Sequence, residues 1–450
     1  MGHALHKDVR ERLLAETLQY VVERVPFYRG LVPSRVEGAD LALTDFPLID
    51  QKIVAQNLRE FLVLDEFPDY VLTSGGTTSG GGSISFRSHQ EYEAVHYCYT
   101  GHASGETPDS TKLEGFAVDI FLNANGQYWR KPAGWPHISI ALEQTTHAEV
   151  IKLLIQDGLT IRERLIPALH VQGQHGAMRA LTGYYVSRGF FPRDFGLRSL
   201  LLYGGHVTQV WLDRFREIWG PTATTVYGLS EFSPGNAFQC SHCNCYHFWT
   251  CWPEFLALNS DRAVVEGDAR LILTSLLPFS TLQHRIRYAT GDIVHLAGHC
   301  SAAGQLGFRF RGRVLSSAIA PGADDEVILS EIDLLEVAED FSDIVRQTHA
   351  AEVNLWSDTS VPRPPFQMGY PRISLAPPID QRNREVVVVL ETTFDPSEAT
   401  ARATVLSERF LTNLHDRYPD LSRKLVDCGM NLKIKLNPSG GSDLRIKATA

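Results

Sequence analysis

The stretch Thr73-Ser74-Gly75-Gly76-Thr77-Thr78-Ser79-Gly80-Gly81-Gly82-Ser83 is the most informative part of this chain, because it consists only of glycine, serine and threonine. Apolar residues flank it in Tyr70-Val71-Leu72 and Ile84-Ser85-Phe86, which predicts a strand, a tight loop and a second strand. Glycine allows positive φ angles and lets the backbone approach a ligand closely. Successive amides in such a loop can converge on an anion, and hydroxyls add donors without bulk. The expected ligand is a polyphosphate.

Two other interpretations of this loop have to be weighed. A glycine- and serine-rich segment can also be a flexible linker. The loop is not a Walker A motif, because no Lys-Ser or Lys-Thr follows its last glycine, and it is not a Rossmann turn, because no helical pattern follows it directly. The assignment therefore depends on the rest of the chain.

Length and composition indicate an enzyme-sized protein of two or three domains, with 450 residues, of which 44% are hydrophobic, and a formal net charge of -10. We find no long basic stripe, which argues against a nucleic-acid partner. We also find no run of 18 apolar residues, so we expect no membrane segment. The N-terminal residues lack a signal-peptide hydrophobic region, and we expect a cytoplasmic protein. The seven cysteines are then expected to be reduced, and a metal is favoured over disulfides.

Apolar spacing divides the chain into a large and a small domain. Residues 8–24 are spaced as a helix that ends before Pro26. Further on, strands and helices alternate, which favours an α/β fold; the strands are expected at 118–122, 199–203 and 270–274, and the helices at 147–156 and 208–218. We place the domain boundary near Arg313, with a large domain over 1–312 and a small domain over 313–450.

The small domain is expected to be built as β-α-β after a loop-rich segment. We expect a helix over 329–339, loops over 354–383, and strands at 385–390 and 431–436. Between these strands, Asp395-Pro396-Ser397-Glu398 has the pattern of a capped helix start, with the helix running to about Arg417.

Three further segments carry groups that suit a nucleotide. Tyr227-Gly228-Leu229-Ser230-Glu231 combines an aromatic ring that can stack on a purine with a carboxylate that can hold magnesium between phosphates. Asp292 follows a glycine turn and suits ribose hydroxyls. Arg313 offers a guanidinium to phosphate or ribose. Each residue alone is more often structural, as a core tyrosine, a solvated acid, a turn residue or a surface ion pair. Their occurrence together in this order favours a nucleotide site.

The order and the residues of these segments resemble the sequence motifs of the adenylate-forming (acyl-CoA synthetase) superfamily. The resemblance is greatest to its phenylacetate-CoA ligase-like branch, which includes coenzyme F390 synthetase-like proteins. The resemblance rests on six segments of the sequence. They are Val25-Pro26-Phe27-Tyr28-Arg29, the segment Phe46-Pro47-Leu48-Ile49-Asp50-Gln51-Lys52, the loop that begins at Thr73, the turn Tyr203-Gly204-Gly205, the segment Tyr227 to Glu231, and the stretch from Gly267 to Asp292.

The resemblance implies a large N-terminal α/β domain, a small mobile α+β C-terminal domain, and a reaction of ATP with a carboxylic acid that gives an acyl-adenylate and pyrophosphate. A thiol, usually coenzyme A, then accepts the acyl group. By position, the phosphate ligands would be Ser74, Gly75, Thr77 and Thr78. Gly204, Gly205 and Tyr227 would flank adenine, Glu231 would hold magnesium, and Asp292 and Arg313 would bind the ribose. Lys447 would be the catalytic lysine of the C-terminal domain.

Several positions depart from the family pattern. The phosphate loop lacks the lysine that commonly follows it, and His206 stands where an acid is usual after the glycine pair. After Gly312-Arg313 the chain reads Val314-Leu315-Ser316, and the hinge acid of the family pattern is absent. Lys447 is displaced by several residues, and a lysine this close to the end of the chain can equally be a surface charge. These changes leave ATP binding in place and put the thioester step in question.

Four of the seven cysteines fall between Cys240 and Cys251, together with His247. Thiolates and an imidazole in a tetrahedral set are what zinc prefers. Branch members hold a structural zinc, and Cys240, His247 and Cys300 match its ligands by position. The fourth ligand is either Cys243 or Cys245, and we choose Cys245. The alternative is a set of buried free thiols.

Three functions are compatible with the sequence. The first is ATP-dependent activation of a carboxylic acid, expected to be aryl because the candidate pocket is rich in aromatic residues, followed by transfer to coenzyme A. The second shares the adenylation but passes the acyl group to an amine, a carrier protein or a small inorganic nucleophile, as in secondary metabolism. The third is a zinc-stabilised nucleotide-binding protein without turnover. A homodimer is compatible with the sequence, which does not fix the oligomeric state.

Overall fold

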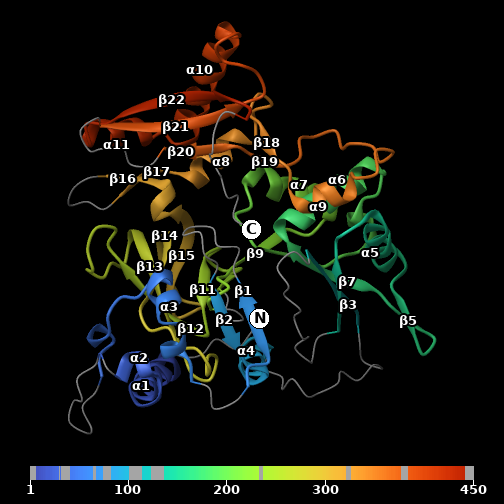
Figure 1. The fold of residues 1–450 in the computed structure, drawn as a ribbon. Helices are drawn as coiled ribbons and strands as arrows, with labels where there is room; N and C mark the ends of the chain where they lie inside the picture. Colours follow the sequence, from blue (N-terminus) through green and yellow to red (C-terminus); the bar gives the residue numbers. More distant parts are fainter. Residues whose placement is uncertain are drawn as a thin grey trace.

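The computed structural model describes residues 7–29, 31, 41–63, 67–73, 83–100, 114–122, 136–232, 237–320, 326–376 and 384–440, and its fold is drawn in Figure 1. The stretch quoted first lies between two strands, β1 (Tyr70–Thr73) and β2 (Ile84–Arg87). They pair antiparallel with Thr73 opposite Ile84, so the predicted strand, loop and strand are confirmed at both ends of the loop.

A mixed sheet forms the centre of the large domain, and its order over the described residues is β12-β13-β14-β15-β11-β10-β9-β8-β7-β3-β4. One half is parallel and contains β3 (Phe116–Phe121), β4 (His137–Ala141), β7 (Ala168–Gln174), β8 (Ser199–Tyr203) and β9 (Ala223–Tyr227). The other half is antiparallel and contains β10 (Ala237–Gln239), β11 (Tyr246–Phe248), β12 (Cys251–Leu256), β13 (Gly267–Ser275), β14 (Tyr288–Cys300) and β15 (Gln305–Arg313). The alternation of strands and helices thus gave the correct fold class.

Three helices cover the parallel half: α5 (Thr145–Asp157), α6 (His175–Ser187) and α7 (Gln209–Trp219). The sequence predicts α5 and α7 correctly to within about two residues. In α7, Trp211, Phe215 and Trp219 are fully buried, as the 3.6-residue period requires. In α6 every residue from 175 to 185 is buried, so this helix is covered on all sides.

A second core lies against the antiparallel half. It includes α1 (Lys7–Arg24), α2 (Pro26–Arg29) and α3 (Gln51–Gln56), while α4 (His89–Thr100) follows the β1–β2 hairpin. Helix α1 ends at the predicted place, because Pro26 begins the next helix. Shorter elements complete the large domain: η1 (Leu43–Asp45), η2 (Leu58–Phe61), η4 (Pro192–Phe195), and the hairpin of β5 (Leu159–Ile161) with β6 (Arg164–Ile166).

The C-terminal unit has its own apolar core. It contains η5 (Val314–Ser316), β16 (Ser317–Ile319), β17 (Val327–Ser330), α8 (Glu331–Ala338), β20 (Ile373–Leu375), β21 (Glu385–Thr392), α10 (Thr400–Arg417), α11 (Leu421–Asp427) and β22 (Asn431–Pro438). Strands β21 and β22 pair in parallel around α10, which confirms the predicted β-α-β arrangement. The predicted boundary near Arg313 falls at the end of β15, where the chain leaves the large sheet.

Two predicted helix starts are wrong. Residues 327–330, of which Leu329 and Ser330 were expected to be helical, form β17, and the Ser330 hydroxyl instead caps α8 by accepting a hydrogen bond from the Asp333 amide. Helix α10 begins at Thr400 rather than next to Asp395. The Asp395 carboxylate accepts hydrogen bonds from the amide and hydroxyl of Ser397, at 2.8 and 2.6 Å, and thus closes a local turn.

The loop-rich segment expected over 354–383 is preceded and partly occupied by short elements, β18 (Arg346–Gln347), α9 (Ala350–Leu355) and β19 (Tyr370–Pro371). Helix α9 lies beside α6 and α7 in Figure 1 and buries Ala351 and Leu355 in the core of the large domain. The chain therefore returns to the large domain after the C-terminal unit has begun.

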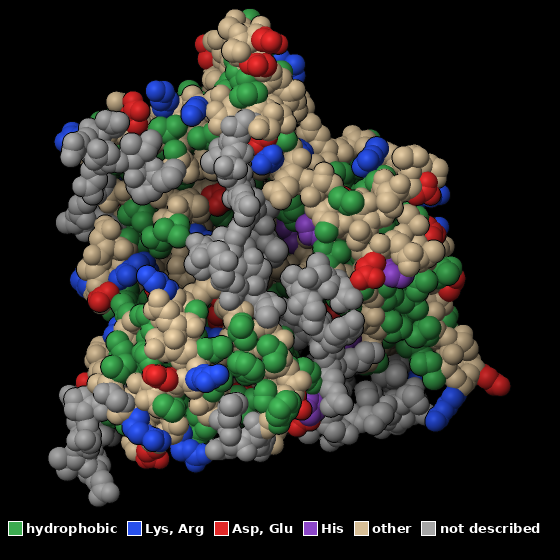
Figure 2. Space-filling view, in the orientation of Figure 1, with side chains coloured by type: hydrophobic (Ala, Val, Ile, Leu, Met, Phe, Trp, Pro, Cys, Tyr) green, Lys and Arg blue, Asp and Glu red, His purple; other side chains and the backbone are tan. Residues whose placement is uncertain are grey.

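Positive and negative side chains are interleaved on the face drawn in Figure 2. Among the described residues on that face, the basic side chains do not gather into a stripe. Among the described helices, none is both long and apolar enough to cross a membrane.

Candidate functional site

The residues predicted to flank adenine, Gly204, Gly205 and Tyr227, lie at the carboxyl ends of two neighbouring parallel strands, β8 and β9. Leu202 pairs with Thr225, so the Gly204-Gly205 turn after β8 lies beside the end of β9 at Tyr227. Gly204 has a φ of +83°, a conformation that favours glycine. In open α/β sheets, ligands bind in the crevice at this edge. Gly204 and Gly205 are thus placed where a planar ring could approach the backbone.

Tyr227, Asp292 and Arg313 form one connected chain of side chains. The Tyr227 hydroxyl donates to Asp292 Oδ2 at 2.5 Å, and Arg313 Nε lies 3.3 Å from Asp292 Oδ1. Asp292 and Arg313 are cross-strand partners on β14 and β15. Burial raises the pKa of Asp292 to about 6, although the Arg313 charge and the Tyr227 hydrogen bond act in the opposite direction. The structure therefore brings together three of the residues that the sequence selected.

The ring of Tyr227 is held among aromatic side chains rather than standing alone. Phe248, Phe308 and Phe310 have their ring centroids 5.8, 5.6 and 5.7 Å from it, and Tyr227 is only 8% exposed. A contact between this ring and adenine, as expected from the sequence, stays a prediction. What the structure adds is a role in supporting Asp292 through the phenolic hydroxyl.

Glu231 lies next to the base of the glycine-rich loop. A small pocket has Ser83 and Ile84 on its wall together with Glu231, Arg285 and Tyr288. The Tyr288 hydroxyl donates to Glu231 Oε1 over a long distance of 3.5 Å. Ser83 is the last residue of the stretch quoted first, so two segments that are far apart in the sequence meet here. The four predicted phosphate ligands in this loop (Ser74, Gly75, Thr77 and Thr78) lie outside the described residues.

Two buried arginines fix this part of the site, and sequence reasoning did not select them. Arg285 Nη1 donates to the backbone carbonyl oxygen of Glu231 at 2.6 Å, and the Arg87 guanidinium donates to the same oxygen. Arg285 also donates to Ser85 Oγ at 3.0 Å, which ties the β1–β2 hairpin to Glu231. Burial and the Arg87 charge lower the pKa of Arg285 to about 10. The available sequence signal was Arg285 itself, two residues before the arginine that opens the Asp292 segment.

We expect Arg285→Met to loosen the junction of hairpin and Glu231. Loss of a charged donor to a buried carbonyl costs about 1–3 kcal/mol. The adenylation expected from the sequence should fall about tenfold or more, because the reacting groups lose their alignment. Chemical unfolding and ATP–pyrophosphate exchange measure the two effects. Arg262→Met, at an exposed position, is the matched control, and equal behaviour of the two variants would contradict this role.

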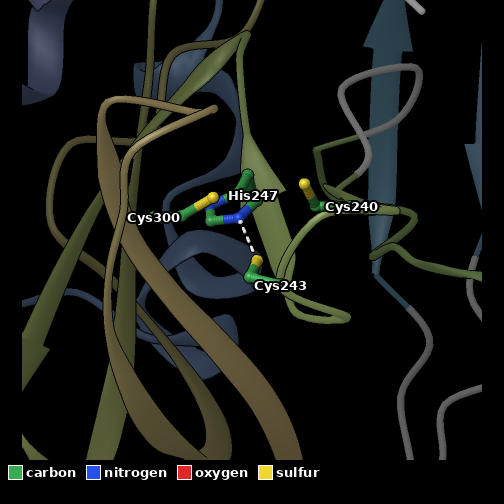
Figure 3. A group of neighbouring side chains, drawn as sticks. All are labelled: Cys240, Cys243, His247 and Cys300. Carbon is green, nitrogen blue, oxygen red and sulfur yellow. Dashed lines mark hydrogen bonds between the residues drawn. The ribbon is translucent and has the colours of Figure 1, made fainter.

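A group of three cysteines and one histidine forms a candidate metal centre, drawn in Figure 3. Cys240 and Cys243 lie in the turn between β10 and β11, His247 lies on β11, and Cys300 ends β14. Their ligand atoms all lie within 4.8 Å of one another. Burial lowers the pKa of His247, which keeps the imidazole neutral as a metal ligand must be. Three sulfurs and one nitrogen at this spacing fit the tetrahedral preference of zinc.

The structure places Cys243, rather than the predicted Cys245, in this group. The carbonyl of Cys245 accepts a hydrogen bond from the Cys240 amide at 2.8 Å, which closes the turn. The Cys245 thiol lies 3.4 Å from the Cys243 carbonyl oxygen, and a Cβ atom placed on Gly307 would lie 2.9 Å from the Cys245 Cβ. Cys245 therefore faces β15, whereas Cys243 Sγ lies 3.2 Å from His247 Nε2.

His206 and Lys447 were both named above as departures from the family pattern, and the structure describes only the first of them. His206, which replaces the usual acid, pairs through Nε2 with Glu336 Oε1 of α8 at 3.0 Å. The amide of Gln209, at the start of α7, also donates to Glu336. Thus a carboxylate is supplied at this place by another part of the chain. Lys447, the predicted catalytic lysine, lies outside the described residues.

Comparison with known proteins was made by family models, by sequence and by structure. No family model matches the chain. It is 24% identical over 346 residues to the phenylacetate-coenzyme A ligase of Thermus thermophilus, and the match covers 73% of each chain.

Solved structures of a 2-hydroxyisobutyryl-CoA ligase have the same fold. Its open conformation with 2-HIB-AMP and CoA has a TM-score of 0.61 and 16% identity, covering 96% of this chain and 87% of that chain. Its thioesterification state has a TM-score of 0.55 and 16% identity, covering 99% and 90%. These similarities confirm the fold predicted from the sequence.

Proposed function

We propose that this chain is a member of the adenylate-forming superfamily, on its phenylacetate-CoA ligase-like branch, and that it is an AMP-forming ligase that activates a carboxylic acid with ATP and transfers the acyl group to coenzyme A. The similarity to a phenylacetate-coenzyme A ligase and the fold shared with a 2-hydroxyisobutyryl-CoA ligase support this proposal. In the first step a carboxylate oxygen attacks the α-phosphorus, and the bond to the leaving pyrophosphate breaks. In the second step the thiolate attacks the acyl carbon, and AMP leaves. No net oxidation or reduction occurs in either step.

The observation that carries the proposal is a small pocket lined by two segments that are far apart in the sequence. Ser83, the last residue of the glycine-rich stretch, and Ile84 of β2 line it together with Glu231 and the buried Arg285. A polyphosphate held by the loop amides would have its oxygens near this carboxylate and this cation. The long 3.5 Å contact from Tyr288 leaves Glu231 room to bind a cation as well. Magnesium bound there would neutralise the charge that develops on the phosphates.

The chain's own residues bind and orient the nucleotide in this proposal. The Asp292 carboxylate accepts hydrogen bonds from the ribose hydroxyls, and Arg313 holds that carboxylate from one side. Tyr227 holds it from the other side, and the Gly204-Gly205 backbone borders the base. These contacts fix the α-phosphorus so that attack is in line with the leaving pyrophosphate.

Acid-dependent ATP–pyrophosphate exchange across aryl and short branched acids tests the first step, and thioester formation on addition of coenzyme A tests the second. Exchange with one of these acids followed by thioester formation supports the proposal. Exchange without thioester would favour transfer to an amine, a carrier protein or another nucleophile, which the absence of the hinge acid after Arg313 also favours. Binding of ATP without exchange would leave only the nucleotide-binding alternative.

We propose that the zinc is structural. Cys240, Cys243, His247 and Cys300 would supply all four ligands of a tetrahedral site and would leave no position for a substrate. The set joins the β10–β11 turn to the end of β14, the strand that carries Asp292.

We expect the KM for ATP to rise as the pH falls through about 6, because protonated Asp292 accepts ribose hydrogen bonds poorly. The limiting slope is about tenfold per pH unit. The raised pKa of Asp292 also means that the folded state keeps a proton that the unfolded chain loses near 3.8, so this group lowers the free energy of unfolding as the pH rises from about 4 to 6. Steady-state kinetics between pH 5 and 8 measures the effect on ATP.

The control for this pH series is Asp261→Asn, which removes an exposed carboxylate. Because ATP itself titrates in the same way in both proteins, the control shows how much of the pH dependence comes from ATP. Asp292→Asn should have a high KM at every pH, with no additional inflection near 6. An unmodified protein that follows the same profile as Asp292→Asn would contradict the assigned role.

A further inference from the structure

An arm of residues 348–369 extends from the C-terminal unit and docks on the large domain. Its stem is the antiparallel pair of β18 and β19, in which Gln347 lies opposite Tyr370. The stem belongs to the C-terminal unit, because the Val345 amide donates to the Glu391 carbonyl on β21 at 2.8 Å. The orange arm with α9 crosses to the green helices α6 and α7 in Figure 1.

The tip of the arm is part of the large domain's core. Ala351, Leu355, Trp356 and Val361 are buried in one cluster with residues of α6 and α7. Two glycines of α6 make room for the arm: a Cβ on Gly176 would lie 2.3 Å from His349 Nε2, and one on Gly183 would lie 2.9 Å from Met368 Sδ. This close approach depends on the absence of a side chain at both glycines.

Arg179 of α6 joins the arm to the C-terminal unit. It is 1% exposed, and its guanidinium carbon lies 4.2 Å from the ring centroids of both Trp211 and Tyr370. It donates to the Gly369 carbonyl and pairs with Glu339, at the end of α8, at 3.3 Å. A buried guanidinium that is stacked and hydrogen-bonded in this way fixes orientation, which lysine would not do.

This docking conflicts with rotation of the C-terminal unit. A rigid rotation about the chain after Arg313 would carry the stem with it, while the tip is held in the core of another domain. Either the tip leaves α6 or the unit stays in place. The buried apolar residues of the tip and the contacts of Arg179 all favour the docked state.

We propose that the docked arm holds the C-terminal unit in one orientation during acid activation, and that release of the arm from α6 gates the transfer step. The proposal rests on the two-step reaction proposed above. Arg179 is accordingly a positioning residue for the C-terminal unit.

A disulfide between the arm and α6 tests the proposal, because it prevents release of the arm. In Gly183→Cys with Met368→Cys, the second change removes two of the three atoms nearest to a new Cβ at position 183, Met368 Sδ and Cε, and leaves Trp356 Cη2 at 3.1 Å. With the crosslink verified by mass spectrometry, exchange should stay near the unmodified rate while thioester formation falls about tenfold or more, and a reductant should restore it. Each single cysteine variant under the same oxidant controls for the native thiols. Unchanged thioester formation in the crosslinked protein would overturn the gate.

A second variant pair tests release without relying on activity. Ala351→Glu buries a charge against α6 and should undock the arm, whereas Val353→Glu, at a 58% exposed position of the same helix α9, should not. Spin-labelled amino acids at Arg216 on α7 and Thr404 on α10 report the distance between the two parts. A single narrow distribution is expected for the unmodified chain and Val353→Glu, and a broad one for Ala351→Glu.

Equal distributions in the three proteins would contradict the holding role of the arm. If no tested acid supports ATP–pyrophosphate exchange by the unmodified chain, the proposed ligase activity is wrong. The distance measurement still decides whether the arm orients the C-terminal unit.

Discussion

Glu231→Gln is expected to reduce acid-dependent ATP–pyrophosphate exchange by about 10²- to 10³-fold, the usual size of losing one electrostatic contact to a transition state. The glutamine amide has nearly the same shape but carries no charge to hold magnesium against the phosphates. Exchange rates at several magnesium concentrations provide the measurement, and the loss should be greatest at low magnesium.

This substitution should leave the fold intact, which makes the result interpretable. Arg87 and Arg285 hold the backbone carbonyl of Glu231, and that oxygen is unchanged in the variant. The thermal midpoint should therefore match that of the unmodified protein. Glu266→Gln, at an exposed carboxylate of the same domain, is the matched control. Exchange that survives in Glu231→Gln at the control's rate would remove Glu231 from the reaction.

Cys300→Ser is expected to abolish binding of one zinc per chain and to destabilise the large domain. At free zinc 100 times its dissociation constant, binding to the folded state alone contributes about 2.7 kcal/mol, and tighter binding contributes more. Because Cys300 ends β14, its loss should also weaken nucleotide binding through Asp292 on the same strand. Metal analysis of the purified protein and chemical unfolding measure the two effects.

Comparison among the cysteines makes this prediction sharper. Cys243→Ser should lose zinc as Cys300→Ser does, whereas Cys245→Ser should keep it, because only Cys243 lies with the other ligands. Cys428→Ser, in the C-terminal unit, is the neutral control. Unmodified protein without zinc, or zinc retained by Cys300→Ser, would disprove the metal centre.

Local patterns predicted the elements well where one cause determines them. Pro26 ends α1, and the unbroken apolar run at 386–390 lies in β21. The errors arose where a side chain had two possible partners. Ser330 and Asp395 both have the pattern of helix caps, yet only Ser330 caps a helix, because Asp395 finds the amide of Ser397 two residues later.

The candidate site was predictable to the extent that motifs name single residues. Asp292, Arg313 and Tyr227 were selected by their surroundings in the sequence, and the fold connects them. Arg87 and Arg285 were not selected, because both donate to one backbone carbonyl oxygen. Every residue has such an oxygen, so the sequence does not indicate which one an arginine will contact. The choice between Cys243 and Cys245 likewise depended on the turn geometry around Asn244, whose φ is +57°. The arm was invisible for a related reason, since its buried contacts join residues more than 150 positions apart.

The burial of α6 from His175 to Tyr185 limits how the protein can be dissected. A fragment that stops at the end of β15 contains every strand of the large sheet, yet it lacks α9, which covers one side of α6. Such an excised piece would present that apolar side to water and self-associate. The independently soluble part of this polypeptide therefore reaches at least to Pro371, well past the last strand of the sheet that it supports.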